Sequence, residues 1–193
     1  MTKEIETLIK KCRSSSFNRS NYSVNVDLKY FVNSMLLHTD YDNKSDGYAW
    51  YDKEYNLNWL TKVTPQFQRS NDKWSKGMQK RFIENLLMGA KTELLLFKMA
   101  EFEDSKIIDG LQRTTAIIDF LNGDIKPFGY QFDELKEYLR QFPNHNLVIK
   151  IYTFDTWEEV GRFYIDMNEN ITHSSEDIQK AKDWFLSEHG IEL

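Results

Sequence analysis

Apolar residues recur at two spacings along the chain, and these spacings predict both helices and strands. Over Met78–Met88 the apolar residues fall three and four positions apart, which is the period of one helix face, and Gly89 follows as a helix stop. The same period over Thr114–Leu121 predicts a second helix. Short aliphatic runs predict three strands, at Leu94–Phe97, Lys106–Ile108 and Leu147–Tyr152.

The C-terminal third continues with helices that begin at hydroxyl caps. Thr156–Glu159 has the form of a capping box, and Val160, Phe163, Tyr164 and Met167 form one apolar face after it. Ser174 and Ser175 precede another amphipathic pattern that continues through Trp184. A shorter helix is expected at Phe132–Leu139.

The N-terminal part is less regular. Ile5–Cys12 has helical spacing and ends at a serine cluster, whereas Tyr22–Leu37 fits either a strand or a buried helix. His38–Asn56 is predicted to be a loop. Five aromatic residues between Tyr41 and Tyr55 suggest that this loop packs over a surface groove, and an ordinary aromatic-anchored loop is the alternative.

Composition fits one polar-surfaced globular domain over residues 1–193. Of these 193 residues, 40% are hydrophobic, and the mean hydropathy is -0.63. No apolar run approaches the roughly 18 to 20 residues that cross a bilayer, and the acidic first residues do not resemble a signal peptide. We therefore expect a cytoplasmic protein without a membrane partner. The single cysteine, Cys12, excludes an internal disulfide and a multi-thiolate zinc site.

The net charge of -5 gives no overall field that favours nucleic acid. DNA binding would need a local patch, and Lys73, Lys76, Lys80 and Arg81 form the candidate. The alternative interpretation of these cations is a solvated helix face.

The segment Ile107–Thr115 carries the strongest chemical signal. An apolar pair enters an Asp109-Gly110 turn and then a helical pattern. Gly110 lets the backbone turn tightly, the first N–H groups of a helix can bind an anion, and Arg113 adds a forked cation. This geometry suits a phosphate cradle. A plain connection in which Asp109 caps the helix is the competing interpretation.

A second segment has similar chemistry. Gln68-Arg69 precedes the first strong helix, as Gln112-Arg113 opens the second, and both pairs offer amide and guanidinium donors for phosphate oxygens. Bonding of Arg69 and Arg113 to neighbouring carboxylates is the simpler alternative. Two such segments favour an anion site.

These motifs resemble the N-terminal domain of GmrSD-type restriction proteins. Three segments occur in that family's order over about residues 60–180. The first is Pro65–Arg69 with Trp74-Ser75 and the helix 81–89. The second, Ile108–Arg113, is similar to an Asp-Gly-Gln-Gln-Arg signature, and the third is Phe163–Asn168 with Ser174–Asp177. The family belongs to the ParB/sulfiredoxin-like superfamily. The resemblance implies an α+β fold with a small mixed sheet and surrounding helices, and leaves residues 1–59 as an N-terminal extension.

The resemblance also implies a site for a nucleoside triphosphate. Asp109, Gln112 and Arg113 would be catalytic, and Asp109 would hold a divalent metal, Mg²⁺ being expected, or orient the attacking group. The residues that would contact the nucleotide are Gln68, Arg69, Gly110, Arg113, Thr114, Thr115 and Asn168. Charge compensation of this kind is most of what phosphoryl transfer requires.

The sequence departs from the family pattern at several points. Leu111 replaces the first glutamine of the signature, which removes one amide, and the prolines usual after Gly89 are missing. The full restriction proteins also carry an HNH-type nuclease domain. Because His38, His145, His173 and His189 are scattered, we do not expect this chain to cleave DNA by itself.

The leading hypothesis is an NTP-binding domain that hydrolyses or transfers the terminal phosphoryl group in DNA modification, phage defence or counter-defence. One alternative is a phosphotransferase with a defined acceptor. Another is a non-catalytic sensor of nucleotide or DNA, or an inhibitor. DNA, modified DNA included, and a separate nuclease or acceptor protein stay open as partners. The nucleotide base and the oligomeric state are not determined by the sequence.

Overall fold

The computed structural model describes residues 3–13, 21–28, 31, 53–101, 105–143, 147–169 and 173–193. Within these ranges the strands form one four-stranded sheet in the order β1-β4-β2-β3. The strands are β1 (Asn21–Val26), β2 (Thr92–Lys98), β3 (Lys106–Asp109) and β4 (Leu147–Thr153). β4 runs antiparallel to β1 and parallel to β2, and β2 runs antiparallel to β3. The predicted mixed sheet in an α+β fold is therefore present.

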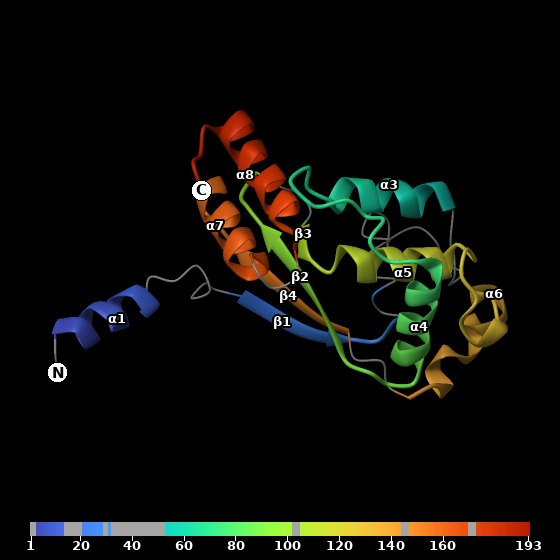
Figure 1. Cartoon of the computed structure of the whole chain (residues 1–193). Coiled ribbons are helices and arrows are strands. Elements are labelled where there is room, and N and C mark those ends of the chain that lie inside the picture. Colours follow the sequence, from blue (N-terminus) through green and yellow to red (C-terminus); the bar gives the residue numbers. More distant parts are fainter. Residues whose placement is uncertain are drawn as a thin grey trace.

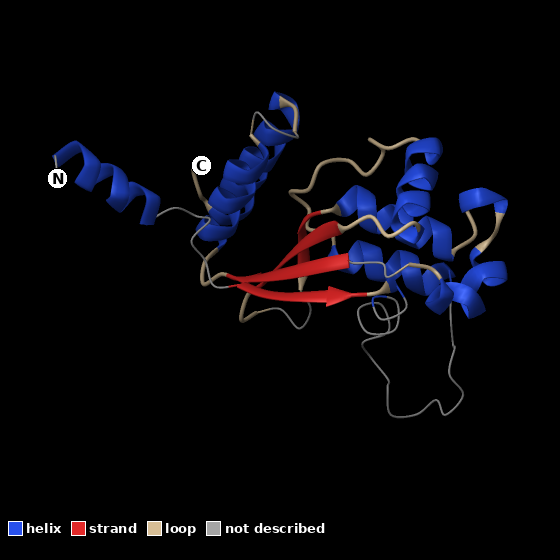
Figure 2. Cartoon of the chain, turned by 90° about the horizontal axis from the view of Figure 1, so that it is seen from below, coloured by secondary structure: helices blue, strands red, loops and turns tan. Residues whose placement is uncertain are grey.

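The helices gather in two groups beside the sheet (Figures 1 and 2). One group contains α3 (Lys53–Val63), α4 (Lys76–Leu87), α5 (Leu111–Leu121), α6 (Phe132–Leu135) and the 3-10 helices η2 (Pro127–Gly129) and η3 (Lys136–Gln141). The other is the pair α7 (Trp157–Asn168) and α8 (Ser175–His189). α1 (Lys3–Arg13) stands apart from both groups. No helix in the described ranges is long and apolar enough to span a bilayer.

Strand β2 separates two hydrophobic cores because side chains alternate across a sheet. Leu94 and Leu96 pack in the core that contains α3, α4 and α5. Leu95 and Phe97 pack in the other core, with α7 and α8. All four side chains are buried. This burial on both faces explains why the sequence shows β2 as an unbroken apolar run.

Most predicted elements are confirmed, with small shifts at their ends. Ser75 caps α4 by accepting from the Met78 N–H, and Thr156 caps α7 by accepting from the Glu159 N–H. Gly89 has a positive φ of 95° directly after α4, as expected of a helix stop.

The predicted loop over His38–Asn56 is wrong at its end. Residues 53–56 form the first turn of α3, a helix that was not predicted anywhere along its length. Asn56 is buried there, and its amide donates to Asn122 Oδ1 at 2.9 Å. Polar residues in that turn made it resemble a loop, although a tertiary contact satisfies one of them. Residues 38–52 lie outside the described ranges, as does most of Tyr22–Leu37 beyond β1.

Strand β3 contains an irregularity next to the Asp-Gly turn. Leu96 pairs with Ile107, but Leu95 pairs with Asp109, so Ile108 is an extra residue in the ladder. A β-bulge of this kind bends the strand and interrupts its pairing. It therefore fixes how the chain enters the turn at Gly110.

Gly110 joins β3 to α5 in a conformation that favours glycine. Its φ is 105° and its ψ is 13°, and a Cβ at this position would lie 2.7 Å from Leu94 Cδ2. Both the dihedral angle and the close approach of β2 exclude a larger residue without rearrangement.

Gly110→Ala is expected to lower the free energy of unfolding by about 1–3 kcal/mol, because alanine is strained at positive φ and would also displace Leu94. Urea denaturation measures this loss. Gly129→Ala is the matched control, since Gly129 has a φ of 91° with no atom within 4 Å of the added Cβ. Equal losses in the two variants would show that the contact with Leu94 has no effect.

Candidate functional site

The two predicted anion-binding segments lie side by side because Gln68 bonds one to the other. Its Nε2 donates to the carbonyl oxygens of Ile107 at 3.0 Å and Ile108 at 2.9 Å. Gln68 is buried, and Phe67 beside it packs against Phe97 and the α7–α8 pair. Gln68 therefore connects the 64–75 segment to the strand that ends at Asp109.

Arg113 and Asp109 form an ion pair across the Asp-Gly turn. Arg113 Nη2 donates to Asp109 Oδ2 at 2.5 Å, and Nη1 donates to the carbonyl oxygen of Glu93 on β2 at 2.5 Å. The side chains are 24% and 33% exposed, respectively. Because a guanidinium has five N–H donors, Arg113 can hold these two acceptors and still donate to an incoming anion.

Arg69 belongs to the same electrostatic environment as Asp109. Both groups influence the pKa of Tyr164 on α7 and the pKa of His173, which directly precedes the α8 cap. Burial is the largest cause in each case, raising the pKa of Tyr164 and lowering the pKa of His173 to about 4. The charges of Arg69 and Asp109, predicted from separate motifs, are thus felt at the same two side chains.

The Tyr164 hydroxyl is a buried polar group at the centre of this region. It makes no hydrogen bond within the described residues, although the backbone N–H of Arg69 is near enough to offset part of the burial effect on its pKa. The centre of the Tyr164 ring lies 5.0 Å from the centre of the Phe67 ring and 5.5 Å from the centre of the His173 ring. The Tyr164 ring therefore packs against the segment that carries Arg69.

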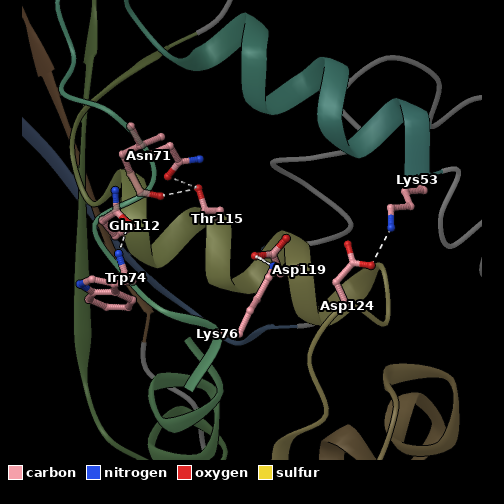
Figure 3. Close-up of polar contacts among 9 residues, drawn as sticks. Lys53, Asn71, Trp74, Lys76, Gln112, Thr115, Asp119 and Asp124 are labelled. Atoms are coloured by element: carbon pink, nitrogen blue, oxygen red, sulfur yellow. Dashed lines mark hydrogen bonds and ion pairs between the residues drawn. The ribbon is translucent and has the colours of Figure 1, made fainter. Parts of the chain in front are cut away.

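The first residues of α5 are covered. Gly110, Leu111 and Gln112 are all buried. Gln112 uses both ends of its amide. Its Oε1 accepts from the Trp74 N–H at 3.1 Å (Figure 3), and its Nε2 donates to the Ser70 carbonyl at 3.2 Å. The helix start predicted as an open phosphate cradle is occupied by the 70–74 segment.

Three further predicted ligands are also buried. The Thr115 hydroxyl bonds Asn71 Oδ1 at 2.8 Å and the Leu111 carbonyl at 2.9 Å (Figure 3). Asn168 donates to the Tyr164 carbonyl at 2.8 Å, and Thr114 is 2% exposed within α5. These side chains shape the site from within, and direct contact with a nucleotide would require them to move.

The structure thus divides the predicted residues into two classes. Arg69, Asp109 and Arg113 are partly exposed. The buried class contains Gln68, Gly110, Gln112, Thr114, Thr115 and Asn168. Tyr164 and His173 were not predicted as members of the site. Tyr164 was assigned only to a hydrophobic helix face, and no local spacing could have indicated its proximity to Arg69.

The candidate DNA patch, which consists of Lys73 and residues of α4, is largely paired with carboxylates. The ammonium nitrogens lie within ion-pair distance of carboxylate oxygens: 3.6 Å from Lys73 to Asp177, 2.7 Å from Lys76 to Asp119 and 3.7 Å from Lys80 to Glu84. Ion pairing reduces the charge that these residues offer to DNA phosphates. The geometry therefore favours the solvated helix face over a DNA footprint.

An open surface hollow of about 580 Å³ lies elsewhere, at α6 and η3. In the part of the chain that the structure describes, no group of three or more His, Cys, Asp or Glu side chains is arranged to hold a metal ion. Asp109 and the two arginines are the accessible chemical groups of the predicted site.

The chain matches no protein-family model, no curated protein and no solved structure.

Gln68→Met should lower the free energy of unfolding by about 1–3 kcal/mol, because methionine keeps the volume but leaves two strand carbonyls without their donor. Thermal and urea denaturation measure the loss. Gln179→Met removes an exposed bond to Asp183 and should change stability little. A Gln68→Met protein as stable as the wild type would mean that the connection to β3 does not depend on this amide.

The lowered pKa of His173 predicts that the protein loses stability in mild acid. In the folded protein this pKa is about 4, below its ordinary value of 6.5, so the unfolded chain binds the proton more readily. The contribution of neutral His173 to the free energy of unfolding is therefore fully present above about pH 6.5, and it is lost as the pH falls towards 4. We expect this loss in the free energy of unfolding to be about 1–2 kcal/mol, because solvent reaches part of the ring and screens its charge. His173→Asn should flatten urea-derived stability between these pH values, and an unaltered slope would contradict the assignment.

Proposed function

We propose that this chain is a ParB/sulfiredoxin-like domain that binds the phosphates of a nucleoside triphosphate with Arg69 and Arg113. The observation that carries the proposal is the convergence of the two motif segments, which the Gln68 hydrogen bonds hold together. Two partly exposed guanidinium groups from separate segments suit the spread negative charge of a polyphosphate.

The phosphate contacts are assigned to side chains and not to the buried start of α5. Arg113 stays positioned by Asp109 and the Glu93 carbonyl while its other donors meet phosphate oxygens. Arg69 contributes from the 64–75 segment. Gln68, Gln112 and Thr115 hold the backbone that presents these arginines.

Asp109 would hold Mg²⁺ with the phosphates and water as the other ligands. Mg²⁺ in nucleotide sites commonly uses one or two carboxylates together with substrate phosphates, so a single accessible carboxylate is a suitable donor. The ion would offset the repulsion between Asp109 and the phosphates and would stabilise charge in phosphoryl transfer.

The activity proposed first is hydrolysis or transfer of the terminal phosphoryl group in DNA modification or phage defence. A non-catalytic nucleotide sensor is the second candidate, and one observation favours it. Asp109 and Gln112, the predicted catalytic residues beside Arg113, already bond other protein groups. Gln112 would need to exchange partners before acting on a substrate, and Asp109 would have to act through the carboxylate oxygen that does not bond Arg113.

Incubation of the pure protein with each NTP and Mg²⁺, with and without DNA, separates these functions. Phosphate release indicates a hydrolase. Turnover only after an acceptor is added indicates a phosphotransferase. Saturable binding without turnover indicates a sensor, and a lack of binding of any NTP contradicts the proposal.

Arg113→Ala and Arg69→Ala are each expected to weaken triphosphate binding by about 1.5–3 kcal/mol, through loss of charge-assisted hydrogen bonds. Calorimetric titration measures the change, and thermal melting checks that each variant remains folded. Arg162→Ala is the control, because Arg162 is exposed on α7 and its Nη2 pairs with Glu158 Oε1, one turn earlier on the same helix, at 2.8 Å. Affinity that survives both site substitutions would remove the arginines from the phosphate site.

A further inference from the structure

The segment 128–142 presents aromatic side chains to solvent on the α4–α6 side of the molecule. Phe128, Tyr130 and Tyr138 are 47%, 52% and 55% exposed. Phe128 also has a positive φ of 53°, which non-glycine residues seldom adopt, and its N–H donates to Glu84 Oε1 at 3.0 Å. Strained backbone of this kind persists where the surrounding structure holds it, and it is concentrated at binding sites.

The hollow beside these rings has the size of a ligand pocket. Its volume is about 580 Å³, and its lining consists of Tyr130, Glu134, Leu135, Tyr138, Gln141 and Phe142. Small-molecule pockets commonly measure about 300–1,000 Å³. Three aromatic rings and one carboxylate therefore meet around a space that can hold a small ligand.

The walls of this pocket are anchored to the protein core. Phe132 and Leu139 are each 1% exposed, and the ring of Phe132 lies edge-on to Phe120 at 5.3 Å. Glu134 is held by its own helix start, where Oε2 accepts from the Gln131 N–H at 2.8 Å. The buried side chains thus fix the segment while Tyr130 and Tyr138 remain available to a ligand.

The chemistry of the lining selects an organic cation. The face of an aromatic ring attracts an ammonium group, and a nearby carboxylate strengthens that attraction. Glu134 would repel a phosphate, which argues against a nucleotide in this pocket. Residues 130–142 contain three carboxylates and two cations, and one of the cations, Lys136, already pairs with Asp133 at 3.0 Å.

We propose that the pocket between α6 and η3 binds an alkylammonium group, held over Tyr130, Tyr138 and Phe142 with Glu134 as its counter-charge. The group belongs to a free quaternary amine or to a methylated lysine side chain, which share this head group. This site is separate from Arg69, Asp109 and Arg113 and does not depend on the proposed nucleotide function.

The test compares choline with 3,3-dimethyl-1-butanol, its neutral isostere, by NMR titration of the folded full chain. Saturable shifts with choline alone are expected, because shape is matched and only the charge differs. Equal binding of the isostere, or no saturable response to choline, overturns the proposal. Trimethyllysine with acetyl and methylamide caps is titrated in parallel, and tighter binding than choline would assign the cation to a protein side chain.

Substitutions locate the site. Tyr138→Ala should weaken choline binding about two- to fivefold, whereas Tyr138→Phe keeps the ring and should bind nearly as well. Glu134→Gln removes the charge while retaining an oxygen that can accept from Gln131, and it should also weaken binding. Tyr22→Ala, which removes an exposed tyrosine on β1, and Arg113→Ala should leave affinity unchanged. Unchanged affinity in both Tyr138→Ala and Glu134→Gln refutes this location.

Discussion

The hydrogen bonds from Gln68 to Ile107 and Ile108 are the interaction on which the site depends. β3 is an edge strand, and its bulge interrupts the ladder, so its carbonyl groups need a donor from outside the sheet. A buried side-chain amide meets that need and brings the 64–75 segment against β3. Arg69 and Asp109 then share one environment because each directly follows a residue in this contact.

The buried polar side chains around α5 have the same structural role. Gln112 and Thr115 attach the 70–74 segment to the helix, and Lys76 pairs with Asp119 at 2.7 Å (Figure 3). Buried polar groups are costly unless they are bonded, so these contacts favour one arrangement of the segment. The site consequently combines buried, hydrogen-bonded amides and hydroxyls with the partly exposed charges of Arg69, Asp109 and Arg113. The pocket at α6 is lined mainly by aromatic side chains and rests on different elements.

The spacing of apolar residues predicted the helices and strands well where burial of their apolar side chains alone decided the pattern. α4 and α5 follow a helical repeat, and β2 is an apolar run because it is buried on both faces. α3 was not predicted, and its first turn was assigned to a loop because Asn56 resembles a loop residue until Asn122 lies beside it. The arginines of the site were predicted from helix-start chemistry, whereas the covering of α5 by a distant segment has no local signal.

The sequence by itself determined most of the helices and strands from residue 76 onward, the mixed class and the candidate charges at Arg69, Asp109 and Arg113, since these depend on residue type and short spacing. Tertiary structure decided which of the predicted residues reach solvent. Gln68, Gln112 and Thr115 carry polar side chains suited to a ligand, but their partners are up to 44 residues away in the chain. Whether such a group binds a ligand or the protein depends on three-dimensional proximity, which spacing along the chain does not encode.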